Sequence, residues 1–76
     1  MRAVLESILA ALVDQPDAVR ITGLEGEKTC IFELRCDNRD LGKVIGKKGK
    51  TIAAIRTVLN AIASRDGKRA LLEVVE

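Results

Sequence analysis

The sequence has no histidine, tryptophan or tyrosine, and it has a single phenylalanine among its 76 residues. Histidine is the commonest general acid–base group and the commonest transition-metal ligand in proteins, and this chain lacks it. We therefore expect no enzymatic activity, no metal site and no cofactor. The scarcity of aromatic rings also leaves little surface for stacking against planar ligands.

Cysteines and long apolar runs are scarce as well. Cys30 and Cys36 lie six residues apart, about 20 Å along one extended strand, well beyond the ~7 Å limit on the Cα separation of a disulfide. We expect both to be small buried hydrophobic side chains in a reducing compartment. The longest apolar run, from Ile8 to Val13, falls far short of the ~20 residues that span a bilayer, and no signal-peptide pattern precedes it. These absences predict a cytoplasmic protein with no membrane association.

The composition is that of a small folded domain. Hydrophobic residues make up 47% of the chain and charged residues 32%, with one proline, which excludes a disordered or collagen-like chain. A chain this short buries only roughly 60% of its unfolded surface and has room for one core. We expect a single domain over residues 1–76.

The charges are unevenly divided between the two halves of the chain. Residues 1–38 carry four basic and seven acidic side chains, whereas residues 39–76 carry nine basic and four acidic ones. Six of the nine basic residues fall between Arg39 and Arg56, with Asp40 the one acid among them. This segment creates a local positive field that suits a polyanion, although a lysine-rich helix end can also be simply solvated.

Apolar spacing predicts a helix and then a hairpin in the first half. From Arg2 to Val13 the apolar residues recur at intervals of one, three and four, as on one face of a helix, which Asp14–Pro16 end. We expect a short strand over Val19–Thr22, a turn over Glu25–Lys28 and a second strand over Cys30–Cys36. One face of the second strand should be strongly buried. That face consists of Cys30, Phe32, Leu34 and Cys36.

Two helices separated by glycines follow the hairpin. The first is capped by Asp37 or Asn38, has Asp40 in its first turn to complement the helix dipole, and stops at Gly46. The second runs from Gly49 to about Ser64. The expected apolar faces consist of Leu41, Val44 and Ile45 in the first helix and of Ile52, Ile55, Leu59 and Ile62 in the second.

A last strand follows a turn at Asp66 and Gly67, and both of its faces are largely apolar between Ala70 and Val75. The element order is therefore αββααβ. A crossover joins the strands on either side of the helix pair, so these strands should be parallel, whereas the first two strands form an antiparallel hairpin. We predict an α+β fold in which a three-stranded mixed sheet carries three helices on one face.

The most informative segment is Gly42–Ile52, with the sequence GKVIGKKGKTI. Gly46 and Gly49 bracket two lysines at the joint between two apolar-faced helices. Because glycine has no Cβ, the chain can turn there with a positive φ and a ligand can approach the backbone closely. The amides and the positive dipole end of the next helix face the same point, which favours a phosphate. Lys47 and Lys48 would add mobile positive charge.

The run VIGKKGKTI is similar to the VIGxxGxxI signature of the KH (K-homology) family at every defined position: Val44, Ile45, Gly46, Gly49 and Ile52. The element order resembles the type II KH arrangement, and the whole chain resembles the small single-KH proteins of bacteria, the KhpA family. The resemblance implies a single KH domain that binds single-stranded RNA, with the GxxG loop on about four backbone nucleotides and the bases in a shallow apolar groove. It also implies a role as an RNA chaperone or post-transcriptional regulator.

The resemblance also assigns the site residues. Within the loop Gly46–Gly49, the glycines would permit close approach of the RNA backbone and the lysines would contact phosphates. Ile45 and Ile52 would form part of the apolar groove and its support. Three further basic residues are weaker candidates, because such side chains are often merely solvated. These are Lys43, Lys50 and Arg56.

Partners follow from the resemblance too. It implies a homodimer and pairing with a larger KH-containing bacterial protein, although no apolar stripe in the sequence identifies the contact surface. With few aromatic side chains, one domain should bind RNA modestly and in a salt-sensitive way, which favours assembly in pairs.

Two other classes of function stay open from the sequence. The paired helices could place the later helix in duplex DNA, but the side chains it would present offer little hydrogen bonding to base edges: Lys50, Ala53, Ala54 and Thr57. The domain could also be a protein-interaction module with little RNA binding. The tripeptide Gly49–Thr51 copies the end of a P-loop, but the first glycine of that motif would fall at Val44 and a helix precedes the loop, which argues against nucleotide hydrolysis.

Overall fold

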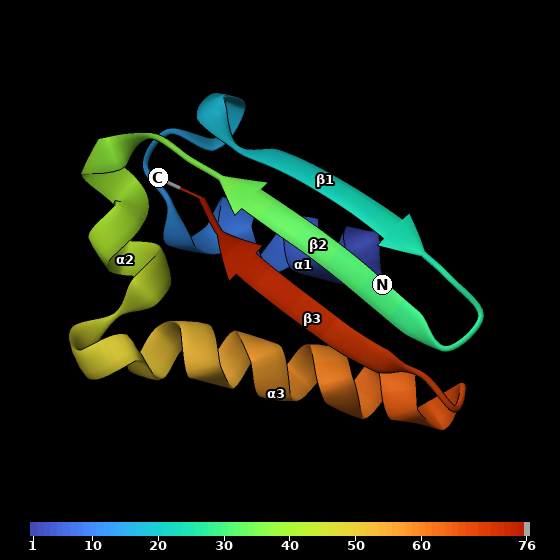
Figure 1. Cartoon of the computed structure of the whole chain (residues 1–76). Helices are drawn as coiled ribbons and strands as arrows, with labels where there is room; N and C mark the ends of the chain where they lie inside the picture. The colour runs from blue at the N-terminus through green and yellow to red at the C-terminus, as the bar shows by residue number, and fades with distance from the viewer. Residues whose placement is uncertain (76) are drawn as a thin grey trace.

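The computed structural model describes residues 1–75, and the order of its elements confirms the predicted αββααβ arrangement (Figure 1). The helices and strands are joined by three short 3-10 turns, labelled η. In chain order the elements are α1 (Arg2–Leu12), η1 (Pro16–Ala18), β1 (Arg20–Glu25), β2 (Thr29–Arg35), η2 (Asn38–Asp40), α2 (Leu41–Ile45), η3 (Lys47–Gly49), α3 (Lys50–Arg65) and β3 (Arg69–Val74).

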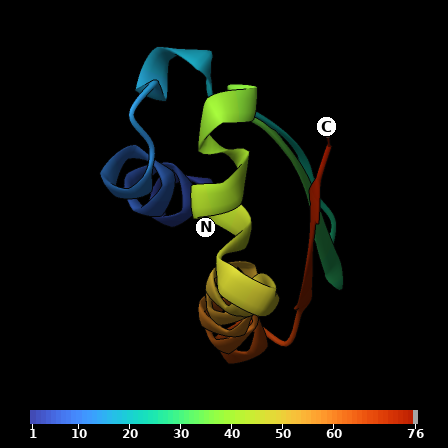
Figure 2. The same ribbon diagram turned by 90° about the vertical axis from the view of Figure 1, so that its left-hand side faces the viewer.

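The sheet is mixed and has the strand order β1-β2-β3. β1 and β2 are antiparallel, with Arg20 opposite Arg35, and β2 and β3 are parallel, with Thr29 opposite Arg69. Seen nearly edge-on, the sheet has all three α-helices on one side (Figure 2). The predicted topology and the placement of the helices are both confirmed.

The core lies between the sheet and the helices. Phe32, at 1% exposure, is its largest side chain, and each large apolar side chain buried there contributes roughly 1.5–3 kcal/mol. Within residues 1–75, none of the helices is long and apolar enough to cross a membrane. The core consists of Leu5, Leu9, Val13, Cys30, Phe32, Leu34, Val44, Ile52, Ile55, Leu59, Ala63, Ala70 and Leu72.

Three details differ from the sequence prediction. β1 continues to Glu25 rather than ending near Thr22, because its pairing with β2 persists to the end of the hairpin. On α3 the fourth buried residue is Ala63 rather than Ile62, which is half-buried. The outward face of β3 is exposed, with Leu71 at 44%, since all the helices cover the other face of the sheet.

Both cysteines have free thiols, with Cys30 buried and Cys36 half-buried. Burial, followed by the nearby charges of Asp40 and Asp37, raises the pKa of the Cys36 thiol. A thiol with a raised pKa stays protonated and is a poor nucleophile. The interpretation of Cys30 as a small core residue is confirmed, and Cys36 packs against the edge of the same core.

Gly23 gives the phenylalanine its place in the core. A Cβ on residue 23 would lie 2.6 Å from Cδ1 of Phe32 and 3.2 Å from the backbone oxygen of Ile31. Because Gly23 is the cross-strand partner of Phe32, the aromatic ring passes directly over the β1 backbone. Any larger residue at position 23 must displace a ring that is fully enclosed.

We predict that Gly23→Ala lowers the free energy of unfolding by about 1–3 kcal/mol, because overpacking forces the ring or the β1 backbone to shift. Urea denaturation followed by circular dichroism measures the change. Gly42→Ala is the matched control: a Cβ on residue 42 meets nothing within 4 Å, and alanine should stabilise α2 by roughly 0.5–1 kcal/mol. Equal stabilities of the two variants would contradict this account of Gly23.

Candidate nucleic-acid interface

The loop between α2 and α3 is a tight left-handed bend. Gly46 ends α2 with φ 76° and ψ 168°, and its amide donates to the carbonyl of Gly42 at 2.8 Å. Lys48, with φ 58° and ψ 26°, and Gly49, with φ 73° and ψ 16°, both adopt the left-handed helical conformation. The Gly49 amide donates to the Gly46 carbonyl at 3.0 Å, which closes the turn. The predicted positive φ values are confirmed at both glycines.

The two glycines have different functions in this bend. A Cβ on Gly46 would lie 2.1 Å from Oγ1 of Thr51 and 2.8 Å from its backbone nitrogen, so the space is already filled by the first turn of α3. A Cβ on Gly49 would meet nothing within 4 Å. Gly46 is therefore required for packing of the chain against itself, whereas Gly49 is the position that stays open to an approaching ligand.

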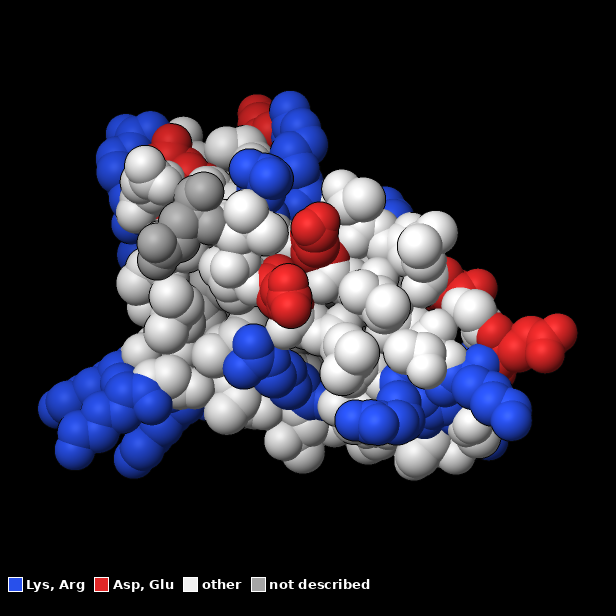
Figure 3. Space-filling model, in the orientation of Figure 1, with Lys and Arg blue, Asp and Glu red and all other residues white. Residues whose placement is uncertain are grey.

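Three lysines surround the loop with exposed side chains. Lys47, Lys48 and Lys50 have no ion-pair or hydrogen-bond partner for their side chains within residues 1–75. The space-filling view shows a cluster of basic side chains projecting from the corner of the molecule where Figure 1 places this loop (Figure 3). The positive charge here is available to an external anion.

The N-terminus of α3 reinforces this charge. Among the described residues, no side chain caps the helix and no acidic residue lies in its first turn, and its N-cap position is Gly49. The partial positive charge of a helix N-terminus therefore faces the loop without a protein carboxylate to neutralise it. Backbone amides, a helix dipole and lysines converging on one point make a phosphate-binding arrangement.

The apolar residues of the motif lie mostly inward. Val44 and Ile52 belong to the core, with exposures of 0% and 6%. Ile45 is half-buried and packs against the edge of the core beside the loop. Of the two isoleucines assigned to a groove by resemblance, Ile52 is thus placed to support the loop, and Ile45 retains surface that a ligand could touch.

Two of the weaker candidates are engaged within the protein. Lys43 pairs with Asp14, and that hydrogen bond raises the pKa of the Lys43 ammonium group. The guanidinium of Arg56 donates from Nε and Nη2 to the carbonyl of Leu72, at 3.1 and 2.9 Å. Both side chains tie helices to neighbouring segments, whereas Lys50 lies beside the loop without a partner within residues 1–75.

Asp40 has a structural function that was not predicted. It ends η2, directly before α2, and its side chain is 1% exposed. Its carboxylate accepts from the amides of Asp14 at 3.1 Å and Gln15 at 2.9 Å, and Lys43 Nζ lies 3.9 Å away. These bonds fasten the start of α2 to the end of α1. The one available signal was an isolated acid in a strongly basic segment.

Asp37, one of the two residues predicted as an N-cap, caps η2. Its carboxylate accepts from the Arg39 amide at 2.9 Å and pairs with the Arg39 guanidinium at 3.0 Å. The side-chain hydrogen bond from Arg39, and then that from its amide, lower the pKa of Asp37 to about 2. The cap is therefore charged at neutral pH.

Comparison with known proteins identifies the family to which this chain belongs. A family model described as "KhpA/KhpB, KH domain" matches residues 2–74, nearly the whole chain. The chain belongs to the KhpA/KhpB KH-domain family. The type II KH fold expected from the element order is the fold observed.

Curated relatives in the KhpA/KhpB family are similar over their full length. A protein of Aquifex aeolicus is 49% identical over 76 residues, which cover 100% of this chain and 96% of the relative. One from Chlamydia pneumoniae is 47% identical over 76 residues, with 100% and 97% covered, and one from Clostridium acetobutylicum is 44% identical over 75 residues, with 99% and 100% covered. Each of these relatives is named "RNA-binding protein KhpA".

The two loop glycines should respond differently to substitution. We predict that Gly46→Ala destabilises the fold by about 3 kcal/mol or more, because its backbone conformation is essentially restricted to glycine and the new Cβ meets Thr51. Gly49→Ala should cost only about 1 kcal/mol, the strain of a left-handed alanine in open space. Chemical denaturation of both variants measures the difference, and similar losses would contradict the distinction.

Asp40 can be tested as the anchor of α2. We predict that Asp40→Ala lowers the free energy of unfolding by roughly 2–4 kcal/mol, because two buried amides lose their acceptor. Asp40→Asn keeps one acceptor oxygen and should cost less. The measurement is urea unfolding monitored by circular dichroism, and an alanine variant as stable as the original chain would refute this assignment.

Proposed function

We propose that this protein binds single-stranded RNA through the loop Gly46–Gly49. The observation that carries the proposal is the N-terminus of α3, which no side chain within residues 1–75 caps, beneath a left-handed turn with three unpaired lysines. This site can hold two or more adjacent phosphates without any base contact, as a KH loop does. The name of the curated relatives, "RNA-binding protein KhpA", supports the same ligand.

Each loop residue then has a defined function. The open side of Gly49 lets the sugar-phosphate backbone approach, and Lys47, Lys48 and Lys50 contact phosphates. Gly46 keeps the bend closed from within, and Ile45 offers a small apolar contact to a base, with Ile52 supporting it from the core. Since Lys43 and Arg56 already hold internal partners, we assign them secondary contributions at most.

The geometry favours a single strand over duplex DNA. A helix in a major groove reads bases with polar side chains on its exposed face. On α3 that face has Ala53 and Ala54, and the hydroxyl of Thr57 donates to the Ala53 carbonyl at 3.0 Å. These residues leave little for base-edge recognition, whereas the loop is suited to a flexible backbone.

We further propose that the functional unit is a single KH domain over residues 1–76, acting in the cytoplasm as an RNA chaperone or post-transcriptional regulator. One loop with no aromatic platform binds few nucleotides, so pairing would raise the effective affinity. A homodimer and a complex with a larger KH-containing protein are the two assemblies we propose. The description of the family model, which joins KhpA with KhpB, is consistent with the second.

The double substitution Lys47→Asp with Lys48→Asp tests the site directly. We expect RNA affinity to fall by at least about tenfold, because two charge-assisted phosphate contacts become repulsive. The fold should persist, since both side chains are exposed and aspartate tolerates the left-handed conformation of residue 48. Fluorescence anisotropy with a labelled mixed-sequence single-stranded RNA provides the measurement.

The matched control is Lys28→Asp with Lys68→Asp, which changes the net charge equally at the other end of α3. This control should lose far less affinity than the loop variant. Unchanged RNA affinity in a folded loop variant would instead favour the alternative hypothesis, a protein-interaction module. Equal losses in both variants would indicate general electrostatic attraction rather than a site.

Salt dependence gives an independent test of phosphate contact. If Lys47, Lys48 and Lys50 each neutralise one phosphate, log K should fall against log salt concentration with a slope of about −2 on single-stranded RNA. In Lys47→Asp with Lys48→Asp the slope should shrink to about −0.7 or less in magnitude. A titration series at several salt concentrations supplies both slopes. A flat response in the original chain would contradict the mechanism.

A further inference from the structure

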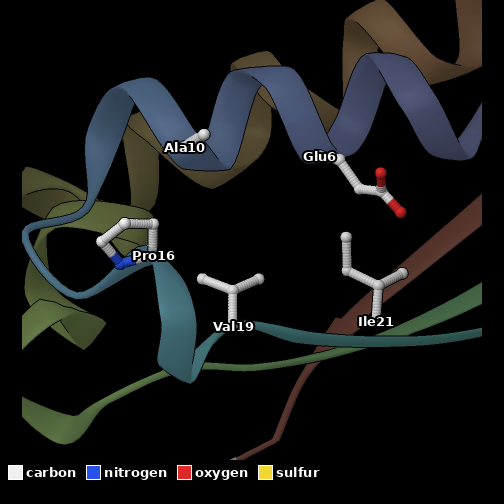
Figure 4. A pocket seen from close by; sticks show the side chains of 5 residues that line it. All are labelled: Glu6, Ala10, Pro16, Val19 and Ile21. Carbon is white, nitrogen blue, oxygen red and sulfur yellow. The ribbon is translucent and has the colours of Figure 1, made fainter.

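A half-open groove lies between α1 and β1, at the opposite edge of the sheet from the RNA-binding loop. Its volume is about 290 Å³, and it is lined by Glu6, Ala10, Pro16, Val19 and Ile21. Figure 4 shows Glu6 and Ala10 on α1 above Val19 and Ile21, with Pro16 towards one end. The groove is apolar along its length and has one carboxylate.

The backbone of β1 borders this groove with an unpaired edge. The Gly26 amide donates to the Thr29 carbonyl at 2.9 Å, which sets which residues of β1 bond to β2. With that register, Ile21, Gly23 and Glu25 direct their amides and carbonyls away from β2. Such an edge is a template for a further strand.

The two edges of the sheet differ in how far side chains cover their backbone groups. On β3, side chains from α3 block the edge: Arg56 donates to the Leu72 carbonyl, and Asn60 accepts from the Ala70 amide at 3.0 Å. On β1, within residues 1–75, one side chain reaches the edge, the exposed Arg2, which donates to the Ile21 carbonyl at 3.0 Å. Gly23 and Glu25 have no such cover in the described part of the chain.

We propose that the groove and the β1 edge together bind an extended peptide segment of a partner protein, which joins the sheet as a fourth strand. Alternate side chains of such a peptide point to the same face, so every second residue would enter the groove. Apolar residues suit Ala10, Val19 and Ile21, and one basic residue suits Glu6, whose carboxylate has no ion pair within residues 1–75. In the complex, a backbone amide of the peptide donates to the Ile21 carbonyl in place of the Arg2 guanidinium.

A second copy of this chain is the less suitable occupant. Antiparallel pairing of two β1 strands about Gly23 would set Glu25 of one copy opposite Ile21 of the other, on the helix-facing side. That places a carboxylate beside the end of the groove that already holds Glu6. Like charges at such a position are unfavourable. The residues that line the groove include one carboxylate and no basic side chain, and they therefore favour a partner of apolar and basic character once the Arg2 guanidinium has left the Ile21 carbonyl.

This proposal goes beyond RNA binding and is independent of it, because β1 and α3 lie on opposite sides of β2 and β3. The probe is a capped synthetic hexapeptide in which valine alternates with threonine and one valine is replaced by arginine. Its titration into the isotope-labelled full chain is followed by amide NMR shifts and hydrogen exchange. We expect the Gly23 and Glu25 amides to shift and their exchange to slow by about tenfold or more at saturation.

Two variants test the two parts of the recognition. Glu25→Pro removes an edge amide that does not bond to β2 and should abolish peptide binding, whereas Glu25→Gln removes the same charge, keeps the amide and should bind. Glu6→Lys should weaken the arginine peptide by about fivefold and strengthen a glutamate analogue by a similar factor. An unchanged circular dichroism spectrum and urea midpoint in each variant establish that it is folded, and if Glu25→Pro does not fold, the charge exchange at Glu6 still decides.

Four results would overturn the proposal. They are an absence of shifts at Gly23 and Glu25 up to the solubility limit of the peptide, shifts confined to α3, equal binding of the arginine and glutamate peptides, and edge protection that grows with protein concentration alone. The last result would assign the edge to a second copy. None of these four measurements uses RNA, so each can still be interpreted if the original chain does not bind RNA. The two proposals can therefore be refuted independently.

Discussion

The side chain of Thr51 fills the space in which a Cβ on Gly46 would lie, and this contact brings α2 and α3 together at the bend. Because residue 46 has φ 76° and ψ 168°, α2 can end and α3 can begin within a few residues of each other. The left-handed turn that follows points Lys47 and Lys48 outward. The helix N-terminus and the lysines converge only while this contact holds.

A second anchor sets the position of the bend relative to the rest of the protein. α2 spans five residues, too few to be stable alone, so its orientation depends on tertiary contacts. Val44 inserts into the core, and Asp40 binds the two amides that follow α1. The buried carboxylate of Asp40 thus positions the loop indirectly, because it fixes α2, the helix that leads into the loop.

Periodicity and turn chemistry were enough to predict the element order, the mixed sheet and the helix-covered face. They depend on local spacing, and here local spacing agrees with the tertiary structure. The position of the loop could be predicted as well, because two glycines flanking two lysines at a helix start form a local pattern. The extent of β1 could not, because Gly23 has no side chain to continue the apolar alternation, and its pairing with Phe32 appears only in the fold.

Roles that depend on distant partners were also beyond prediction. Nothing in the spacing around Arg56 indicates that its guanidinium meets the Leu72 carbonyl, and nothing near Lys43 indicates Asp14. The same holds for Asp40, because the two backbone amides that donate to its carboxylate lie more than twenty residues away. A sequence shows which residues are charged. Which of these charged side chains are engaged by partners within the protein appears only with the fold.

The parallel pairing of β2 with β3 determines the order in which the strands can pair during folding. The hairpin of β1 and β2 can form as soon as both strands are available, whereas β3 pairs only after the entire helical crossover has been made and its ends have met. Because the whole crossover must close before β3 can pair, we expect the docking of β3 onto β2 to be the slow step in the folding of this domain.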